Sequence, residues 1–286
     1  MVQASAGMEI VGAMRTDTGL VRTLNEDSVA WVTPHDDDVA ANRGSLALVA
    51  DGMGGHAAGE VASALAADVI RRLYYDLDGP IPQVLASAFA SANRAIIEYA
   101  QEHPECRGMG TTCTVLAFRD QQAWLAHIGD SRAYLLRDRR LTQLSEDQTL
   151  VAKLVSEGTL THEEANHSPM HNVILQALGT TSNIKPMIGT KGLPLHVGDV
   201  FILCSDGVSN MVPDEKIAEV ASRLPPQEAC DALIEAALAA GGDDNASLGV
   251  FSVTTGAAPK RVEPTTRRIK LPIAANQNPS SSPRPR

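Results

Sequence analysis

The chain has 286 residues, of which 44% are hydrophobic but only 3% aromatic, so its core has to be built mainly from Ala, Val, Leu and Ile. No apolar stretch approaches the ~18 residues of a membrane-spanning helix, and residues 1–8 lack the basic-then-apolar layout of a signal peptide. The four cysteines show no C-x-x-C spacing, which is typical of reduced thiols in the cytosol. We therefore expect a soluble, cytoplasmic protein that does not contact a membrane.

The formal net charge of −10 is unevenly distributed. Residues 256–286 contain seven Lys or Arg against one Glu, a net of +6, which leaves −16 on residues 1–255. An acidic body argues against nucleic-acid binding, which depends on neutralising phosphates with cations. The basic segment also holds six prolines and few large apolar residues, so we expect residues 256–286 to form a disordered tail.

In chain order, residues 9–255 predict one domain without internal repeats. Short apolar runs predict strands at 29–32, 46–50, 111–118, 123–128, 133–136, 141–144, 200–204 and 246–253. Apolar residues four apart predict helices at 60–75 and 82–100, and two more helices are expected at 213–224 and 227–240. Residues 145–185 are polar and predict a mostly helical segment. Strand clusters separated by helix pairs indicate stacked sheets covered by helices, not a doubly wound parallel sheet.

Acidic residues stand at the ends of several of these strands. Asp51-Gly52 follows 46–50, Gly129-Asp130 follows 123–128, Asp206-Gly207 follows 200–204, and Asp243-Asp244 precedes 246–253. Glycine beside a carboxylate lets the backbone bend and approach a ligand closely. Carboxylates with few His or Cys nearby favour hard cations such as Mg²⁺ or Mn²⁺. In isolation each Asp could equally form a turn or cap a helix.

Taken together, six short motifs in order resemble the metal-dependent protein phosphatases of the PPM (type 2C) family in their compact bacterial form. The motifs are Gly19-Leu-Val-Arg-Thr-Leu-Asn-Glu-Asp27, Asp51-Gly-Met-Gly-Gly-His56, Gly108-Met-Gly-Thr-Thr112, Gly129-Asp-Ser-Arg132, Ser205-Asp-Gly207 and Gly242-Asp-Asp-Asn245. They cover nearly the whole of residues 9–253. A single Asp-Gly is common in any turn, whereas six motifs in family order are specific.

The resemblance implies two Mn²⁺ or Mg²⁺ ions in the active site, which would activate a water and neutralise charge on the phosphoryl oxygens. By the same resemblance, Asp51 bridges the two ions and the backbone carbonyl of Gly52 binds one of them. Glu26 would join that ion directly or through water. Asp206 and Asp244 would hold the other.

The resemblance also implies roles for four further side chains. Arg22 would bind the substrate phosphate with its planar fork, and Asp27 would orient waters behind the ligands. Asp130 would hold a weaker third metal ion, with a structural role in its turn as the alternative. Other family members have a His directly after the bridging Asp-Gly, where this chain has Met53. For His56 three roles stay open: general acid, substrate contact, or a hydrogen bond within the loop.

As for fold and function, the resemblance implies an α+β, four-layer αββα sandwich of two mostly antiparallel sheets flanked by helix pairs, with a small helical flap at about 145–190. It implies a monomeric phosphatase of phosphoserine and phosphothreonine in proteins, opposing a bacterial Ser/Thr kinase and acting on that kinase or its substrates. Gln148 and His171 stand where bacterial relatives usually have His and Arg, which leaves substrate choice open. The alternative is a pseudophosphatase, a phosphoprotein-binding or metal-sensing module on the same fold. A phosphatase dedicated to one small regulator is a further reading.

Overall fold

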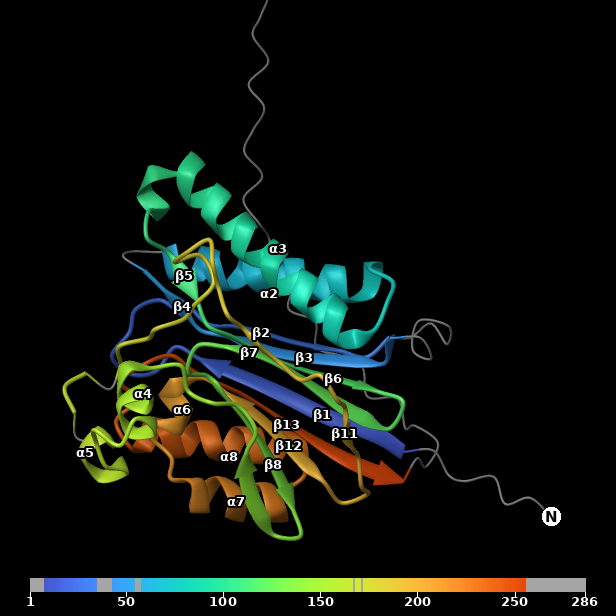
Figure 1. Cartoon of the computed structure of the whole chain (residues 1–286). Coiled ribbons are helices and arrows are strands. Elements are labelled where there is room, and N and C mark those ends of the chain that lie inside the picture. The colour runs from blue at the N-terminus through green and yellow to red at the C-terminus, as the bar shows by residue number, and fades with distance from the viewer. Residues whose placement is uncertain (1–7, 35–42, 55–57, 167, 171, 256–286) are drawn as a thin grey trace, which may run out of the picture.

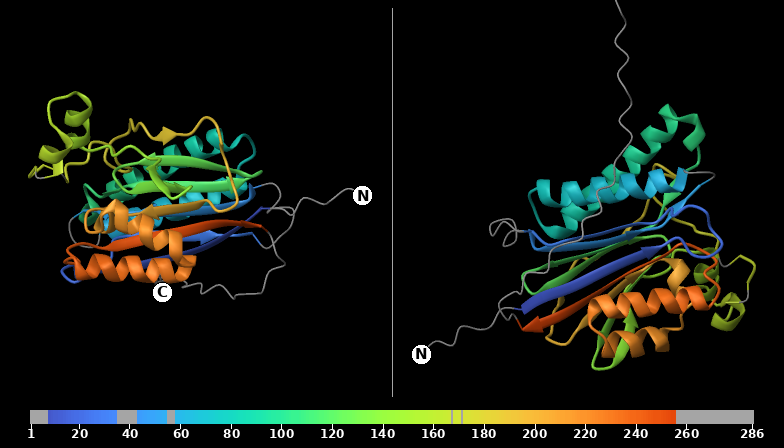
Figure 2. Two further views of the ribbon diagram at one scale, coloured as in Figure 1. Left: turned by 90° about the horizontal axis from the view of Figure 1, so that it is seen from below. Right: turned by 180° about the vertical axis from the view of Figure 1, so that it is seen from behind.

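A computed structural model describes residues 8–34, 43–54, 58–166, 168–170 and 172–255. Two β-sheets lie face to face, and a pair of helices covers the outer face of each (Figure 1). The two further views in Figure 2 show the same order of layers, helix pair, sheet, sheet and helix pair. The expected αββα sandwich is therefore confirmed.

The first sheet has the strand order β10-β7-β6-β3-β2, and every pair in it is antiparallel. Its strands are β2 (Ser28–Val32), β3 (Ser45–Ala50), β6 (Cys113–Arg119), β7 (Gln122–Ile128) and β10 (Met187–Ile188), and β11 (Leu193–Pro194) also pairs with β7. Helices α2 (Ala58–Asp76) and α3 (Ile81–Glu102) cover this sheet. Both helices bury an apolar face that includes Ile70, Leu85 and Phe89. The four-residue spacing of apolar residues correctly predicted these helices.

The second sheet has the strand order β1-β13-β12-β8-β9 and is again antiparallel. Its strands are β1 (Met8–Asp17), β8 (Arg132–Arg137), β9 (Arg140–Gln143), β12 (Val200–Cys204) and β13 (Ala246–Thr255). Helices α7 (Asp214–Arg223) and α8 (Pro226–Ala239) cover it. The ten-residue strand β1 was not predicted, and it pairs along its full length with β13.

Four of the ten aromatic residues gather between the two sheets. Trp31 and Phe118 from the first sheet meet Phe201 and Phe251 from the second, with ring centroids 4.8–6.1 Å apart. Mainly aliphatic side chains fill the space between each sheet and its helices, together with aromatic ones such as Tyr74, Phe89 and Tyr134. The four cysteines are free and buried, as their spacing predicted. Among the described residues, every helix is too short or too polar to cross a membrane.

The segment expected to be a flap is less helical than its sequence indicated. Its described residues form only two short helices, α4 (Leu150–Ser156) and α5 (His162–Asn166). The backbone N–H of Leu150 donates to the carbonyl of Val173, and that of Leu175 donates to the carbonyl of Gln148. The remaining short elements in the described part of the chain are β4 (Gly52–Met53), β5 (Gly110–Thr111), the 3₁₀ turn η1 (Pro104–Cys106) and α6 (Asp206–Ser209).

Candidate metal and phosphate site

Loops and the short elements β4 and α6, at one end of the sandwich, hold every described residue that the sequence assigned to the site. Arg22, Glu26 and Asp27 lie between β1 and β2, and the other carboxylates follow or precede a strand of either sheet. These carboxylates belong to Asp51, Asp130, Asp206 and Asp244. The structure therefore brings together side chains that are more than 200 residues apart in the sequence. His56 lies outside the described residues.

The backbone of Asp51 is fixed by two threonines of the Gly-Met-Gly-Thr-Thr motif. The N–H of Asp51 donates to Thr112 Oγ1 at 3.0 Å, and the N–H of Thr112 donates to the Asp51 carbonyl at 2.9 Å. Thr111 Oγ1 donates to the same carbonyl at 2.8 Å. Thr112 Oγ1 also lies 2.7 Å from Ser131 Oγ, beside Asp130. The threonines thus link the Asp51 backbone to the turn that contains Asp130.

Two glycines allow Glu26 to lie against the start of α2. A Cβ on Gly52 would lie 2.2 Å from the Gly59 carbonyl oxygen, and one on Gly59 would lie 2.7 Å from the Glu26 carboxyl carbon. With no side chain at either position, the Glu26 carboxylate lies against Gly59 in the first turn of the helix, and the Gly59 backbone opposes the rise in the Glu26 pKa that burial causes. A helix N-terminus favours a negative charge. The glycines are therefore needed to place this carboxylate.

Asn245 joins the two loops that hold Arg22 and Asp244. Its side-chain amide donates to the carbonyls of Thr18 and Leu24, both at 2.8 Å, and its Oδ1 accepts from the Glu26 N–H at 2.8 Å. The side chain is 5% exposed, so these bonds form out of water, where leaving one unmade would be costly. Asn245 therefore fixes the path of the β1–β2 loop.

Ser205 performs a similar task for Asp27. Its hydroxyl donates to Asp27 Oδ2 at 2.9 Å and accepts from the Ser247 N–H at 3.0 Å. The sequence indicated no role for Ser205 or Asn245, although they lie in the motifs Ser205-Asp-Gly207 and Gly242-Asp-Asp-Asn245. The groups to which they hydrogen-bond, Asp27 and the β1–β2 loop, are distant in the sequence, and a local motif does not reveal such partners.

The clustered carboxylates disfavour one another's charge. Burial raises the pKa of Asp27 and of Asp130 to about 7 in each case. Burial, followed by repulsion from Asp27, Asp206 and Asp130, raises the pKa of Asp51 well above its usual value. Burial and the nearby Asp244 raise the pKa of Asp206. A nearby cation would remove this penalty, because it favours the charged form of every carboxylate around it.

The donor set fits a hard divalent cation. Three buried carboxylate oxygens, Glu26 Oε1, Asp27 Oδ1 and Asp130 Oδ1, have no hydrogen-bond partner in the structure, although buried polar atoms are normally satisfied. Within the described ranges, no three His, Cys, Asp or Glu side chains form a ready-made metal cage. Mg²⁺ retains several waters and needs only a few carboxylates, so an open oxygen-only site suits it.

Arg22 is the cation that lies among these carboxylates. Its Nη2 donates to Asp244 Oδ2 at 2.7 Å, and the two side chains are 51% and 36% exposed. An arginine has five N–H donors, so this pairing leaves donors for a phosphate. The position at the exposed edge of the carboxylate cluster suits the expected phosphate contact.

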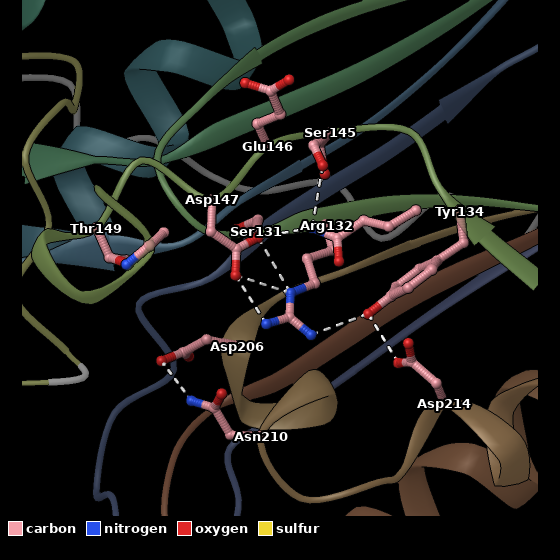
Figure 3. A network of polar contacts seen from close by, with 12 residues as sticks. Ser131, Arg132, Tyr134, Ser145, Glu146, Asp147, Thr149, Asp206, Asn210 and Asp214 are labelled. Carbon is pink, nitrogen blue, oxygen red and sulfur yellow. Dashed lines mark hydrogen bonds and ion pairs between the residues drawn. The ribbon is translucent and has the colours of Figure 1, made fainter. Parts of the chain in front are cut away.

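A second arginine ties the Asp130 turn to the root of the flap (Figure 3). Arg132 donates to both carboxylate oxygens of Asp147, at 2.7–3.1 Å, and to Tyr134 Oη at 3.1 Å. Tyr134 in turn donates to Asp214 at the start of α7. Next to Asp147, the Gln148 N–H donates to the Gly129 carbonyl, and Gln148 Oε1 accepts from the Gly129 N–H. Gln148 thus has a structural role that its sequence position did not reveal.

Comparison with known proteins assigns the family. The family model described as "Protein phosphatase 2C" matches residues 21–239, which is more than half of the chain. The chain belongs to the protein phosphatase 2C family. The resemblance seen in the six motifs is therefore confirmed, and the family's known folds agree with the sandwich described above.

Individual relatives support this assignment. The chain is 43% identical over 244 residues to the "Serine/threonine protein phosphatase PstP" of Mycobacterium tuberculosis, covering 84% of this chain and 44% of that protein. It thus spans less than half of that relative's length. It is 34% identical over 240 residues to "Serine/threonine phosphatase stp" of Listeria monocytogenes, covering 82% of this chain and 92% of that protein. The structure of the PstP catalytic domain in complex with two manganese ions matches with a TM-score of 0.75 at 40% identity, over 87% of this chain and 100% of that one.

Proposed function

We propose that this chain is a metal-dependent phosphatase that hydrolyses phosphoserine and phosphothreonine in proteins, with two Mn²⁺ or Mg²⁺ ions per site and a weaker third. The observation that supports this most directly is the cluster of buried carboxylates with unpaired oxygens beside Arg22. The two named relatives are Ser/Thr phosphatases, and one of them has been seen with two manganese ions.

In the proposed mechanism the metal ions, when bound, supply an activated water and neutralise charge on the phosphoryl group. Asp51, Asp206, Asp244, Glu26 and the Gly52 carbonyl are the proposed ligands. Thr111 and Thr112 hold Asp51 in place through its backbone.

The remaining residues bind and orient the substrate and the ligands. Arg22 binds the substrate phosphate through paired N–H donors, which fixes its orientation. Asp27, held by Ser205, orients the waters around the ligands. Asp130, whose turn is tied to the flap through Gln148, holds the third ion.

Metal dependence is the decisive test. The protein purified with EDTA should not hydrolyse p-nitrophenyl phosphate, and Mn²⁺ or Mg²⁺ should restore turnover while Zn²⁺ should not, because the donors are oxygens only. Mn²⁺ should also bind in calorimetry, without substrate present. Full turnover in excess chelator would exclude the two-metal mechanism.

The same assay separates the enzyme from a pseudophosphatase. A pure phosphoprotein-binding module would bind Mn²⁺ or phosphopeptide but show no turnover. The complete set of acidic residues favours the enzyme.

We further propose that the protein is cytoplasmic, acts as a monomer and opposes a bacterial Ser/Thr kinase in signalling. Incubating it with a phosphorylated kinase domain and following phosphate release tests the proposed kinase partner.

A further inference from the structure

Large apolar side chains are exposed around Arg22. Leu20, Val21 and Leu24 are 68%, 64% and 46% exposed, and we call these three residues the apolar rim. An isolated exposed Leu or Val is ordinary on a protein surface, whereas several close together mark an interaction site. Here three lie within two positions of the proposed phosphate-binding arginine.

The rim lies on a loop whose backbone is firmly held. The Leu20 N–H donates to the Gly242 carbonyl at 2.8 Å, and Asn245 binds the carbonyls of Thr18 and Leu24. A Cβ on Gly19 would lie 2.3 Å from the Asp244 carbonyl oxygen, so the loop packs directly on its neighbour. The apolar side chains are thus presented on a fixed backbone. Binding to such a preorganised surface does not incur the cost of ordering a loop.

Exposed large apolar residues also occur on the flap, at the end of the molecule that holds the β1–β2 loop. Nine large apolar side chains are exposed among the described residues, and three of the other six belong to the flap: Met170, Val173 and Leu175. Their segment pairs with residues 148–150, and Gln148 bonds Gly129 next to Asp130. The flap and the β1–β2 loop lie at the same end of the sandwich (Figure 1). Exposed apolar groups therefore occur on two segments at this end of the sandwich.

We propose that the apolar rim selects phosphopeptides with aliphatic side chains next to the phosphorylated residue. This inference rests on the proposed function, since it places the substrate phosphate at Arg22. An extended chain advances ~3.5 Å per residue. The rim residues are at most two positions from Arg22, so the side chains one or two positions from the phosphorylated residue of a bound peptide span the same length of chain. The many carboxylates nearby and the charge of −16 on residues 1–255 disfavour acidic residues at those positions.

The test uses the full chain with Mn²⁺ and three short phosphothreonine peptides that differ only at the flanking positions, which are Leu, Ser or Glu. For the wild type we expect kcat/KM to follow the order Leu, Ser, Glu, with the Glu peptide improving as salt screens the repulsion. The variants are Val21→Thr, which keeps the shape of the side chain, and a combined Leu20→Gln, Val21→Thr and Leu24→Gln protein. The matched control is Val197→Thr, since Val197 is 52% exposed in the loop between β11 and β12.

In the combined variant, kcat/KM for the Leu peptide should fall about tenfold, through KM, to the value for the Ser peptide. Turnover of p-nitrophenyl phosphate should change less than about twofold in all variants, because this substrate has no flanking residues. Val197→Thr should leave both activities unchanged. Equal rates on the Leu and Ser peptides with the wild type would overturn the proposal, as would an equal loss in Val197→Thr.

Two further outcomes are informative. If the wild type does not hydrolyse p-nitrophenyl phosphate, the proposed function fails, whereas turnover without flank preference refutes the rim alone. If light scattering shows a wild-type dimer that the combined variant abolishes, the rim is an interface between two copies and the peptide assignment is wrong.

Discussion

Replacing Arg22 separates phosphate binding from transition-state stabilisation. A hydrogen bond to a charged group contributes about 1.5–3 kcal/mol, and the Arg22 side chain is 51% exposed, so the low end applies. One to two such bonds correspond to a rise in KM of about 10- to 100-fold for Arg22→Ala, since each 1.4 kcal/mol is a factor of about ten. We expect kcat to change little, because the metal ions already supply cations to the transition state. The lost ion pair with Asp244 is partly exposed and should cost at most about 1 kcal/mol of stability.

Steady-state kinetics on p-nitrophenyl phosphate at saturating Mn²⁺, for the wild type and the Ala and Lys variants, measure these effects. Arg22→Lys should recover only part of the lost affinity, because an ammonium keeps the charge but not the planar fork. A fall in kcat with unchanged KM would instead assign Arg22 to charge that develops in the transition state. If the Ala variant keeps both constants, Arg22 does not contact the substrate.

Three other perturbations test separate parts of the molecule. Asp51→Asn should lower kcat more than tenfold, which is a rise in the activation barrier of more than about 1.4 kcal/mol. The melting temperature of the metal-free protein should stay unchanged or rise, because one of several repelling charges is gone. Retained turnover would show that Asp51 is not a ligand. A chain ending at Thr255 should keep wild-type kcat on p-nitrophenyl phosphate, and loss of activity would refute the reading of residues 256–286 as a disordered tail. Burial lowers the pKa of His127, so the folded state loses stability as pH falls below about 6.5. Urea unfolding from pH 8 to 5 should therefore show a smaller loss for His127→Asn than for the wild type, and parallel curves would contradict this.

Most of the regular elements could be predicted from the sequence because their apolar residues follow a clear period. Helices α2 and α3 have an apolar face, and strand β12 is apolar throughout. Strand β1 escaped prediction because it contains Glu9, Gly12 and Arg15 and is half-buried along its length. Its strand conformation depends on pairing with β13, which lies at the other end of the sequence. A local pattern cannot reveal such a partner.

The candidate site likewise contains residues that a local sequence pattern indicates and residues that it does not. Asp51, Asp206 and Asp244 could be proposed from the sequence because each stands beside a recognisable strand and within a short motif. Ser205 and Asn245 were overlooked because their bonds, to Asp27 and to the β1–β2 loop, join segments that are distant in the chain. The flap was expected to be more helical because its polar composition did not reveal the backbone bonds between 148–150 and 173–175.

The position of β13 between β1 and β12 has a consequence for synthesis of the protein. Among the described strands, β1 pairs only with β13, so it gains this partner when β13 has left the ribosome, and Asn245 then fixes the loop that holds Arg22. Contacts between the two ends of a chain form late, since the whole intervening loop must close first. A growing chain therefore cannot complete the loop that holds Arg22 before translation has passed β13. A chain that ends upstream of β13 would therefore leave β1 without this partner strand.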